Sequence, residues 1–299
     1  MPCDEGFVGL GQMGLPMAKN LANAGYSLSV FDPSPVACAE AVKCPAVSIA
    51  TSPASVAQQS PVIFTCLPSA EAVRQVYTGA NGFIQAGQSG IVTCDHSTMS
   101  PEVSRALAKD MIVADIHFLE APIFGIPIQA HEADVYFAVA GEEAHVGTIS
   151  PFLEVMGRGY RYVGETGVAH TMKILQNGLG MGHAVLTAEI IVICERLGLD
   201  TGSFIDLVKE ARALGLSVFF ERYATALVSG EKTNAGLVPV CAKDTSLARR
   251  LAHEVDLPAP ILEEAAAVFQ EAMDRGWAEE ELTVATRIAR GRKGNMYIE

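Results

Sequence analysis

The sequence predicts a parallel α/β domain followed by an all-α domain that is built around a long interdomain helix. Three observations indicate this class. A glycine-rich turn joins a strand to a helix near the start, and β-prone runs alternate with helical patterns as far as residue 163. An apolar periodicity without proline then covers residues 164–197, and no convincing strand follows it. We therefore expect two domains, residues 1–163 and residues 164–299.

The first strand, at residues 5–8, leads directly into a GxGxxG pattern and a helical pattern at residues 15–24. The first glycine permits the tight turn, the second lets the backbone approach a pyrophosphate, and the third lets helix and strand pack closely. A second strand, residues 27–31, ends in Asp32, where a carboxylate meets the adenosine ribose hydroxyls. These features predict a Rossmann-type dinucleotide-binding domain. The residues assigned to the cofactor here are Gly9, Leu10, Gly11, Gln12, Met13, Gly14 and Asp32.

Asp32 also bears on the choice of cofactor. A carboxylate at this place accepts hydrogen bonds from a free 2'-hydroxyl and repels a 2'-phosphate. The next residues, Pro33 to Pro35, offer no arginine that would bind such a phosphate. NAD is therefore favoured over NADP.

The remaining α/β elements place several loops at one edge of the sheet. Strands are expected at residues 62–66, 91–95, 117–121 and 159–163, with a hairpin-like piece at 131–141, and helices at 70–77, 101–109 and 142–156. Ligands of such sheets bind beyond the carboxyl ends of the strands. Leu67-Pro68, Ser97-Thr98 and residues 122–126 fall at those ends.

The long helix carries the charged residue of greatest interest. Lys173 and Asn177 are separated by one helical turn and leave the same face. An apolar helix often carries a lysine whose amine simply reaches solvent. A partly desolvated lysine near a nicotinamide instead has a lowered pKa and exchanges protons with a substrate oxygen. Further helices are expected at residues 201–212, 217–228, 238–255, 260–275 and 279–290.

Composition excludes several classes of function. A net charge of -13 argues against non-specific nucleic-acid binding, which depends on clustered lysine and arginine. The apolar streaks, such as residues 190–194, are short, so no membrane span is expected, and the start lacks a secretory signal, which favours a cytoplasmic protein. The seven cysteines and seven histidines show no metal-ligand spacing, so no metal is assigned.

Four motifs in order resemble the β-hydroxyacid dehydrogenase family, which includes 3-hydroxyisobutyrate dehydrogenase and tartronate semialdehyde reductase. Residues 9–21 resemble its opening GxGxMGxPMAxNL, and residues 95–101 resemble its DxSTxSP segment. Residues 173–177 match its KxxxN motif, and residues 243–244 match a KD pair late in its helical domain. Taken alone, the KD pair is typical of a solvated ion pair.

The resemblance implies a nicotinamide enzyme that oxidises a 3-hydroxy acid or reduces the matching semialdehyde or keto acid. Lys173 would be the general acid/base and Asn177 its orienting partner. The nicotinamide side of the cofactor would be lined by Leu67, Pro68, Thr98 and Lys243. Members of the family dimerise or tetramerise through the helical domain, so a homodimer or homotetramer is expected.

The chain departs from the family in the substrate loop. Where the family reads DAPVSGG, residues 120–126 read EAPIFGI, so Phe124 replaces a serine and Ile126 replaces a glycine. This exchange predicts a substrate with an apolar or aromatic portion. The substrate contacts implied by the resemblance are Ser97, Phe124, Gly125, Ile126 and Asn177.

Three alternatives stay open at this point. A 6-phosphogluconate-type dehydrogenase shares the run from Lys173 to Gly178, but no cluster of arginine and lysine for a phosphate is found near the loop. Imine reductases on this scaffold commonly replace the lysine. A non-catalytic dinucleotide-binding module that recognises a protein partner also tends to lose it.

Overall fold

The computed structural model describes residues 5–212, 215–233 and 236–292. Two compact units divide the chain, Met1–Lys173 and Ile174–Glu299, and each is described by itself. The division falls inside the long helix α8 (Val168–Arg196). The boundary predicted between residues 163 and 164, ahead of this helix, stays a prediction.

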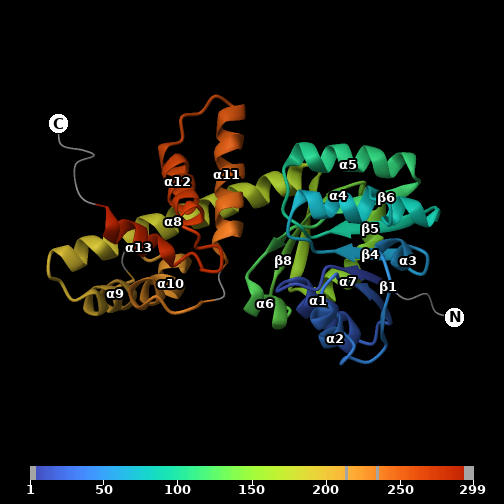
Figure 1. Ribbon diagram of the computed structural model, residues 1–299, viewed down its shortest axis with the longest axis horizontal. Coiled ribbons are helices and arrows are strands. Elements are labelled where there is room, and N and C mark those ends of the chain that lie inside the picture. The colour runs from blue at the N-terminus through green and yellow to red at the C-terminus, as the bar shows by residue number, and fades with distance from the viewer. Residues whose placement is uncertain (1–4, 213–214, 234–235, 293–299) are drawn as a thin grey trace. The chain divides into compact units, whose positions relative to one another are not determined.

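The first unit holds one mixed, mostly parallel sheet, coloured from blue to yellow-green in Figure 1. Its strand order is β3-β2-β1-β4-β5-β6-β8-β7, with β9 paired to β8. The first six strands follow the order 3-2-1-4-5-6 of a Rossmann fold, which confirms the predicted fold class. The strands are β1 (Glu5–Val8), β2 (Leu28–Phe31), β3 (Val47–Ile49), β4 (Val62–Thr65), β5 (Ile91–Asp95), β6 (Ile116–Glu120), β7 (Ile123–Phe124), β8 (Tyr136–Gly141) and β9 (Gly159–Gly164).

Helices cover both faces of this sheet because successive strand residues point to opposite sides. On one face, Phe64 and Leu119 of the strands pack with Leu21 of α1 and Phe152 of α7. On the other, Ile63 packs with residues of α3, α4 and α5. The helices are α1 (Gly14–Asn23), α2 (Pro35–Ala41), α3 (Pro53–Ala57), α4 (Ala70–Thr78), α5 (Pro101–Val113), α6 (Pro127–His131) and α7 (Val146–Met156), with 3-10 turns η1 (Phe83–Ala86) and η2 (Glu143–His145).

The described part of the second unit is helical, as predicted. Its core gathers Ala188 and Ile191 of α8 with side chains such as Phe269 and Ile288. Gly178 makes the packing close, since a Cβ there would lie 2.8 Å from the Cβ of Ala248. The helices after α8 are α9 (Thr201–Glu210), α10 (Val218–Ser229), α11 (Val238–Glu254), α12 (Pro260–Asp274) and α13 (Val284–Gly291).

Helix α8 is long and apolar enough to cross a membrane when length and composition alone are considered. Its most apolar window has a mean hydropathy of 1.4, and 44% of that window is buried within the protein. Short apolar streaks in the sequence had predicted no such segment. The core helices of soluble proteins meet the same criterion, and Ala184, Ala188 and Ile191 of α8 lie in the core of the second unit.

Candidate active site

The carboxyl ends of four parallel strands lie side by side in the first unit. The register pairs Val8 with Thr65, Thr65 with Asp95, and Asp95 with Glu120. The segments that follow these strand ends are the glycine turn after β1, Leu67 after β4 and residues 96–98 after β5. The sheet therefore gathers at one edge the loops that the sequence assigned to a cofactor.

The glycine turn is shaped by steric necessity at two of its three glycines. Gly9 has a φ of +95°, and a Cβ there would lie 2.3 Å from the carbonyl oxygen of Cys66. A Cβ at Gly14 would lie 2.0 Å from the carbonyl oxygen of Gly9. Gly11 differs, because a Cβ there would meet no atom within 4 Å. The protein's own packing does not require glycine at this exposed position, whereas close approach of a ligand would.

The start of helix α1 suits an anion. No side chain caps its first turn, and that turn carries no acidic residue. Free backbone N–H groups at a helix N-terminus favour a phosphate. Together with the open space at Gly11, this arrangement fits the pyrophosphate of a dinucleotide.

Asp32 follows β2 and is half-buried beside the glycine turn. Its Oδ2 accepts a hydrogen bond from the Leu10 N–H at 2.7 Å, and its Oδ1 accepts one from the Ser34 N–H at 2.7 Å. An ionised carboxylate has acceptor capacity beyond these two bonds. Asp32 thus fixes the turn and retains lone pairs for a ribose hydroxyl.

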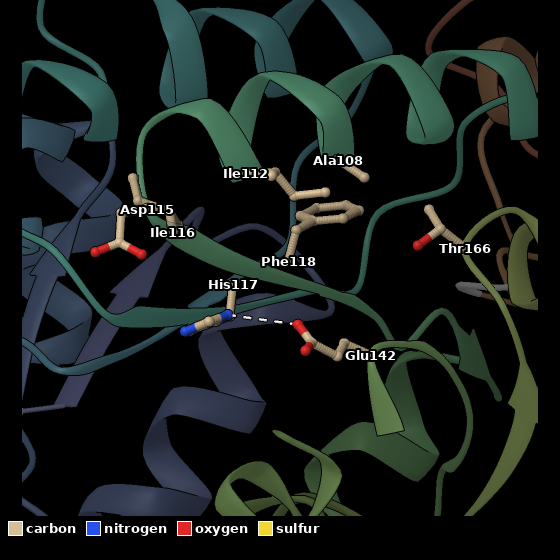
Figure 2. Close-up of a pocket in the computed structure, with 8 residues that line it drawn as sticks. All are labelled: Ala108, Ile112, Asp115, Ile116, His117, Phe118, Glu142 and Thr166. Atoms are coloured by element: carbon tan, nitrogen blue, oxygen red, sulfur yellow. Dashed lines mark ion pairs between the residues drawn. The ribbon is translucent and has the colours of Figure 1, made fainter. Parts of the chain in front are cut away.

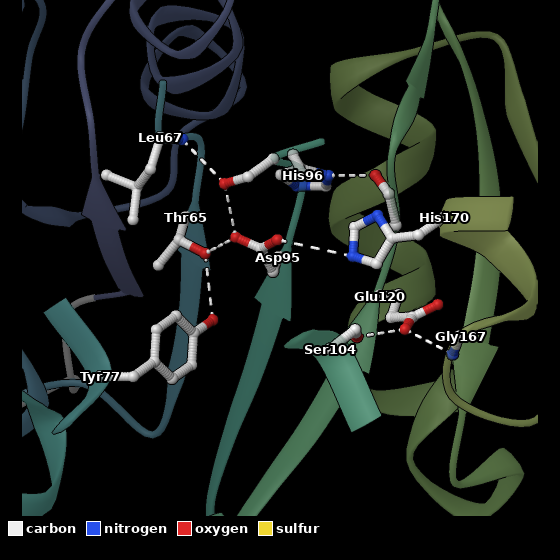
Figure 3. A network of polar contacts seen from close by, with 11 residues as sticks. Thr65, Leu67, Tyr77, Asp95, His96, Ser104, Glu120, Gly167 and His170 are labelled. Atoms are coloured by element: carbon white, nitrogen blue, oxygen red, sulfur yellow. Dashed lines mark hydrogen bonds and ion pairs between the residues drawn. The ribbon is translucent and has the colours of Figure 1, made fainter. Parts of the chain in front are cut away.

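A buried chain of hydrogen bonds connects β4, β5 and the loop after β4 (Figure 3). The Asp95 Oδ1 accepts from the Thr65 hydroxyl at 2.6 Å and from the Ser97 hydroxyl at 2.7 Å. The Ser97 oxygen in turn accepts from the Leu67 N–H at 2.9 Å. Ser97 is only 3% exposed. Within this network its side chain holds the backbone of Leu67. Its predicted contact with substrate stays a prediction.

Burial shifts the pKa values of two neighbouring groups in this network in opposite directions. Desolvation raises the pKa of Asp95 to about 6, although the hydroxyls of Thr65 and Ser97 favour its charged form. Desolvation lowers the pKa of His96 to about 4. The His96 Nδ1 lies 2.7 Å from the carbonyl oxygen of Ala121, and its ring packs between Phe64 and Phe137.

Glu120 holds the beginning of α8. Its buried carboxylate accepts hydrogen bonds from the Ser104 hydroxyl and, at 2.6 Å, from the Gly167 N–H directly before the helix (Figure 3). Desolvation raises the pKa of Glu120, and the bonds from Ser104 and the α8 backbone oppose that shift. One turn into the helix, the Nε2 of the fully buried His170 lies 3.9 Å from the Asp95 Oδ2. The strand ends and α8 are thereby tied together.

Lys173 is buried, with 8% of its surface exposed, and its ammonium lies over an aromatic ring. The Nζ is 5.3 Å from the centroid of Phe124, which is within the range of a cation–π contact. Phe124 belongs to β7 and packs against Ala138, Ala140 and Ala169. The ring that replaces the family's serine is therefore a neighbour of the proposed catalytic amine.

The rest of the substrate loop is held by packing and capping. A Cβ on Gly125 would lie 2.7 Å from the Cγ1 of Val135, so a larger side chain does not fit there. Ile126 is half-buried and precedes α6, and its N–H donates to the Gln129 side chain at 3.2 Å. On the cofactor side, Thr98 is half-buried and Pro68 is exposed.

Two other predicted residues, Asn177 and Lys243, both contact Asp244 in the second unit. The Asn177 side-chain amide donates to the Asp244 Oδ2 at 2.7 Å. The Nζ of Lys243 lies 3.6 Å from the Asp244 Oδ1. Asp244 is 4% exposed and orients both residues, a role that the sequence did not assign to it.

Sequence reasoning also missed Glu120, His170 and Thr65. Glu120 stood in the quoted loop motif and His170 one turn ahead of Lys173, but neither had a partner that spacing could reveal. Thr65 and His170 meet Asp95 of β5, whereas Glu120 meets Ser104 of α5 and the Gly167 N–H before α8. These partners are far apart in the sequence, so only the fold brings them together.

Two family models, one for each half of the chain, together match nearly all of it. The NAD binding domain of 6-phosphogluconate dehydrogenase matches residues 4–164, and the NAD-binding domain of NADP-dependent 3-hydroxyisobutyrate dehydrogenase matches residues 167–288. The solved 3-hydroxyisobutyrate dehydrogenase of Salmonella typhimurium has a TM-score of 0.87 and 26% identity, over 95% of this chain and 99% of that one.

Two sequence relatives differ in how much of the chain they cover. The mitochondrial 3-hydroxyisobutyrate dehydrogenase of Mus musculus is 38% identical over 195 residues, which are 65% of this chain but only 58% of that enzyme. The 2-(hydroxymethyl)glutarate dehydrogenase of Eubacterium barkeri is 28% identical over 285 residues, which are 95% of this chain and 93% of that enzyme.

Proposed function

The chain belongs to the β-hydroxyacid dehydrogenase family, and we propose that it is an NAD(P)-dependent oxidoreductase that interconverts a 3-hydroxy acid and its semialdehyde or keto acid. The single observation that supports this most is the setting of Lys173. A buried amine in the first turns of α8, held over an aromatic ring, is suited to exchange a proton with a substrate oxygen.

The proposed reaction divides into two transfers. A bound nicotinamide supplies the acceptor for the hydride that leaves the hydroxyl-bearing carbon. In the oxidising direction the neutral Lys173 amine accepts the hydroxyl proton as the carbonyl forms and becomes an ammonium, and in the reducing direction this ammonium returns the proton to the oxygen. Asn177 would orient the reacting oxygen, and its bond to Asp244 fixes the direction of its side-chain amide.

The residues of the first unit support NAD as the preferred cofactor. Asp32 provides a carboxylate at the end of β2, and Pro33 to Pro35 provide no cation for a 2'-phosphate. The relatives include an NADP-dependent group, so a direct comparison of both cofactors belongs to the first activity assays.

Phe124 directs the choice of substrates. Its ring supplies apolar surface next to Lys173, where a serine hydroxyl would otherwise bind a small polar acid. We therefore propose that 3-hydroxy acids with an apolar or aromatic substituent are preferred over unsubstituted ones.

The decisive experiment replaces the amine. Lys173→Ala should lower kcat by at least about 10²-fold, the lower range for a positioned acid/base, with little change in the Kd of NAD. Lys109→Ala, at an exposed lysine of α5, serves as the matched control and should retain full activity. Turnover near the wild-type rate in Lys173→Ala, or cofactor binding without turnover across a broad panel of hydroxy acids, would overturn the proposal.

A further inference from the structure

We propose that His117, Glu142 and His145 form a binding site for Zn²⁺. The three side chains belong to the first unit, and their ligand atoms lie within 4.8 Å of one another. Two imidazoles and one carboxylate make a common set of protein ligands for zinc, with a fourth position left for water.

The distances within this cluster fit a metal better than hydrogen bonds. The Glu142 Oε2 lies 3.5 Å from the His117 Nδ1 and 3.6 Å from the His145 Nε2. Hydrogen bonds between nitrogen and oxygen are usually about 2.7 to 3.2 Å long. Ligands of a tetrahedral zinc ion, each at about 2.1 Å, lie about 3.4 Å from one another. The observed separations therefore match two edges of a zinc tetrahedron.

Strand pairing explains how the cluster forms from residues that are far apart in sequence. β6 and β8 are antiparallel, with Leu119 opposite Gly141, so His117 of β6 approaches Glu142 just after β8. The 3-10 turn η2 then brings back His145, whose ring stacks on that of His117 with centroids 3.7 Å apart. No local spacing in the sequence indicates such a site, which is why none was assigned.

The cluster is distinct from the cofactor edge of the sheet. The register places His117 opposite Val92, near the start of β5, whereas Glu120 lies opposite Asp95 at the carboxyl end. Figure 2 shows His117 and Glu142 beside a hollow whose upper wall includes Ile112 and Phe118. Two of the three proposed ligands, His117 and Glu142, therefore line this hollow.

The ligand chemistry predicts the preference among metals. Imidazole nitrogens favour Zn²⁺ and similar transition metals, whereas Mg²⁺ prefers an octahedron of oxygen ligands. A bound Zn²⁺ would join β6 to the segment that leads into α7. Because binding to the folded state raises the free energy of unfolding, Zn²⁺ should raise the melting temperature of the protein.

The test is a calorimetric titration of the tag-free full-length protein with Zn²⁺ at neutral pH, after treatment with a chelator. The expected result is one site per chain, with a Kd raised at least about tenfold in His117→Ala and in His145→Ala. His253→Ala is the matched control, because His253 also pairs with a glutamate, Glu263, but in the second unit. A titration with Mg²⁺ should show no binding at this site.

Two outcomes would overturn the proposal. One is a wild-type protein that binds no Zn²⁺, and the other is equal Zn²⁺ affinity in the wild type, His117→Ala and His145→Ala. Melting temperatures of the metal-free variants, measured first, show that each variant is folded. NADH turnover by folded variants should equal that of the wild type, since neither histidine lies at the cofactor edge.

Discussion

The ammonium of Lys173 lies 5.3 Å from the centroid of Phe124, so the side chain that departs from the family's pattern contacts the residue proposed to carry the chemistry. The ring's negative face stabilises a positive charge. Phe124 is thus a candidate both for positioning the amine and for selecting the substrate.

The first prediction concerns this contact. Phe124→Leu keeps apolar bulk but removes the ring face, at a cost of about 0.5 to 2 kcal/mol to the ammonium. We expect kcat to fall by about 2- to 30-fold, with a smaller change in KM. Steady-state rates with the best substrate of the panel measure the effect. Phe124→Tyr keeps the ring and should stay within about twofold of the wild type; equal losses in both variants would contradict the cation–π interpretation.

The second prediction concerns the bond between Ser97 and the Leu67 N–H. Ser97→Ala removes the acceptor for this N–H and one donor to Asp95, so we expect the cofactor side of the loop to lose order. The Kd of NAD, measured by calorimetry, should rise about 5- to 10-fold, which corresponds to one net hydrogen bond of about 1 kcal/mol or slightly more.

The control for Ser97→Ala is Ser52→Ala, which loses the hydrogen bond that caps α3 in the same unit. It should lower the melting temperature without changing the Kd of NAD. If Ser52→Ala weakens NAD binding as much as Ser97→Ala does, the effect is one of general stability and the network has no special role.

An element of the fold could be predicted from the sequence when the residues that specify it are contiguous in the chain. The strands at residues 62–66 and 91–95 and the glycine turn were found because each is specified by a contiguous run of residues. β3 was missed because it has three residues and two of them are exposed, so it lacks an apolar signature. The short helix α2 has Ser34 as its cap and Pro35 at its start, but its seven residues are too few to give a clear helical periodicity.

The site was predicted in the same uneven way. Lys173 and Asp32 were assigned from motifs that lie along the chain, and their roles stay predictions. The contact between Lys173 and Phe124 was not, because it depends on the pairing of β7 with β8 and on where α8 begins. Asp244 was likewise known only as a member of a KD pair, and its bond to Asn177 joins two helices of the second unit.

The third prediction concerns cofactor choice. Asp32→Asn removes the negative charge at the end of β2, so it weakens contacts with the ribose hydroxyls and lessens repulsion of a 2'-phosphate. We expect the ratio of kcat/KM for NAD to that for NADP to fall at least about tenfold, as for the loss of one charged hydrogen bond. Asp110→Asn makes the same charge change at an exposed position of α5 and should leave the ratio unaltered. An unchanged ratio in Asp32→Asn would remove the basis for preferring NAD.

The fourth prediction concerns pH and stability. Because the pKa of His96 is about 4 in the folded protein and near 6.5 when unfolded, its neutral form contributes stability that is lost as the pH falls through this window. The raised pKa of Asp95, about 6, acts in the opposite sense, since stability is lost as the pH rises from about 4 to 6. The two contributions therefore partly cancel in the wild type.

His96→Asn separates the two contributions, because an amide nitrogen still donates toward the carbonyl of Ala121. Relative to the wild type, the variant should gain stability as the pH falls from 6.5 to 4, by at most about 3 kcal/mol. Urea denaturation at several pH values measures the difference. His131→Asn, at an exposed histidine of α6, should follow the wild type. A difference that does not vary with pH would show that His96 contributes through packing alone.

The last prediction concerns assembly, and it rests on an apolar stripe along α8 in the second unit. Leu179, Leu186, Ile190, Ile193 and Leu197 recur at helical spacing and are 36 to 70% exposed. An exposed apolar stripe of this kind is typical of an interaction surface, and we expect a second copy of the chain to cover it. We expect a homodimer or larger homo-oligomer in light scattering, and dissociation in Leu186→Glu, with the helix content kept because the side chain is exposed. Leu207→Glu, at an exposed leucine of α9 outside the stripe, should leave the assembly intact; a monomeric wild type, or an intact assembly in Leu186→Glu, would exclude this surface.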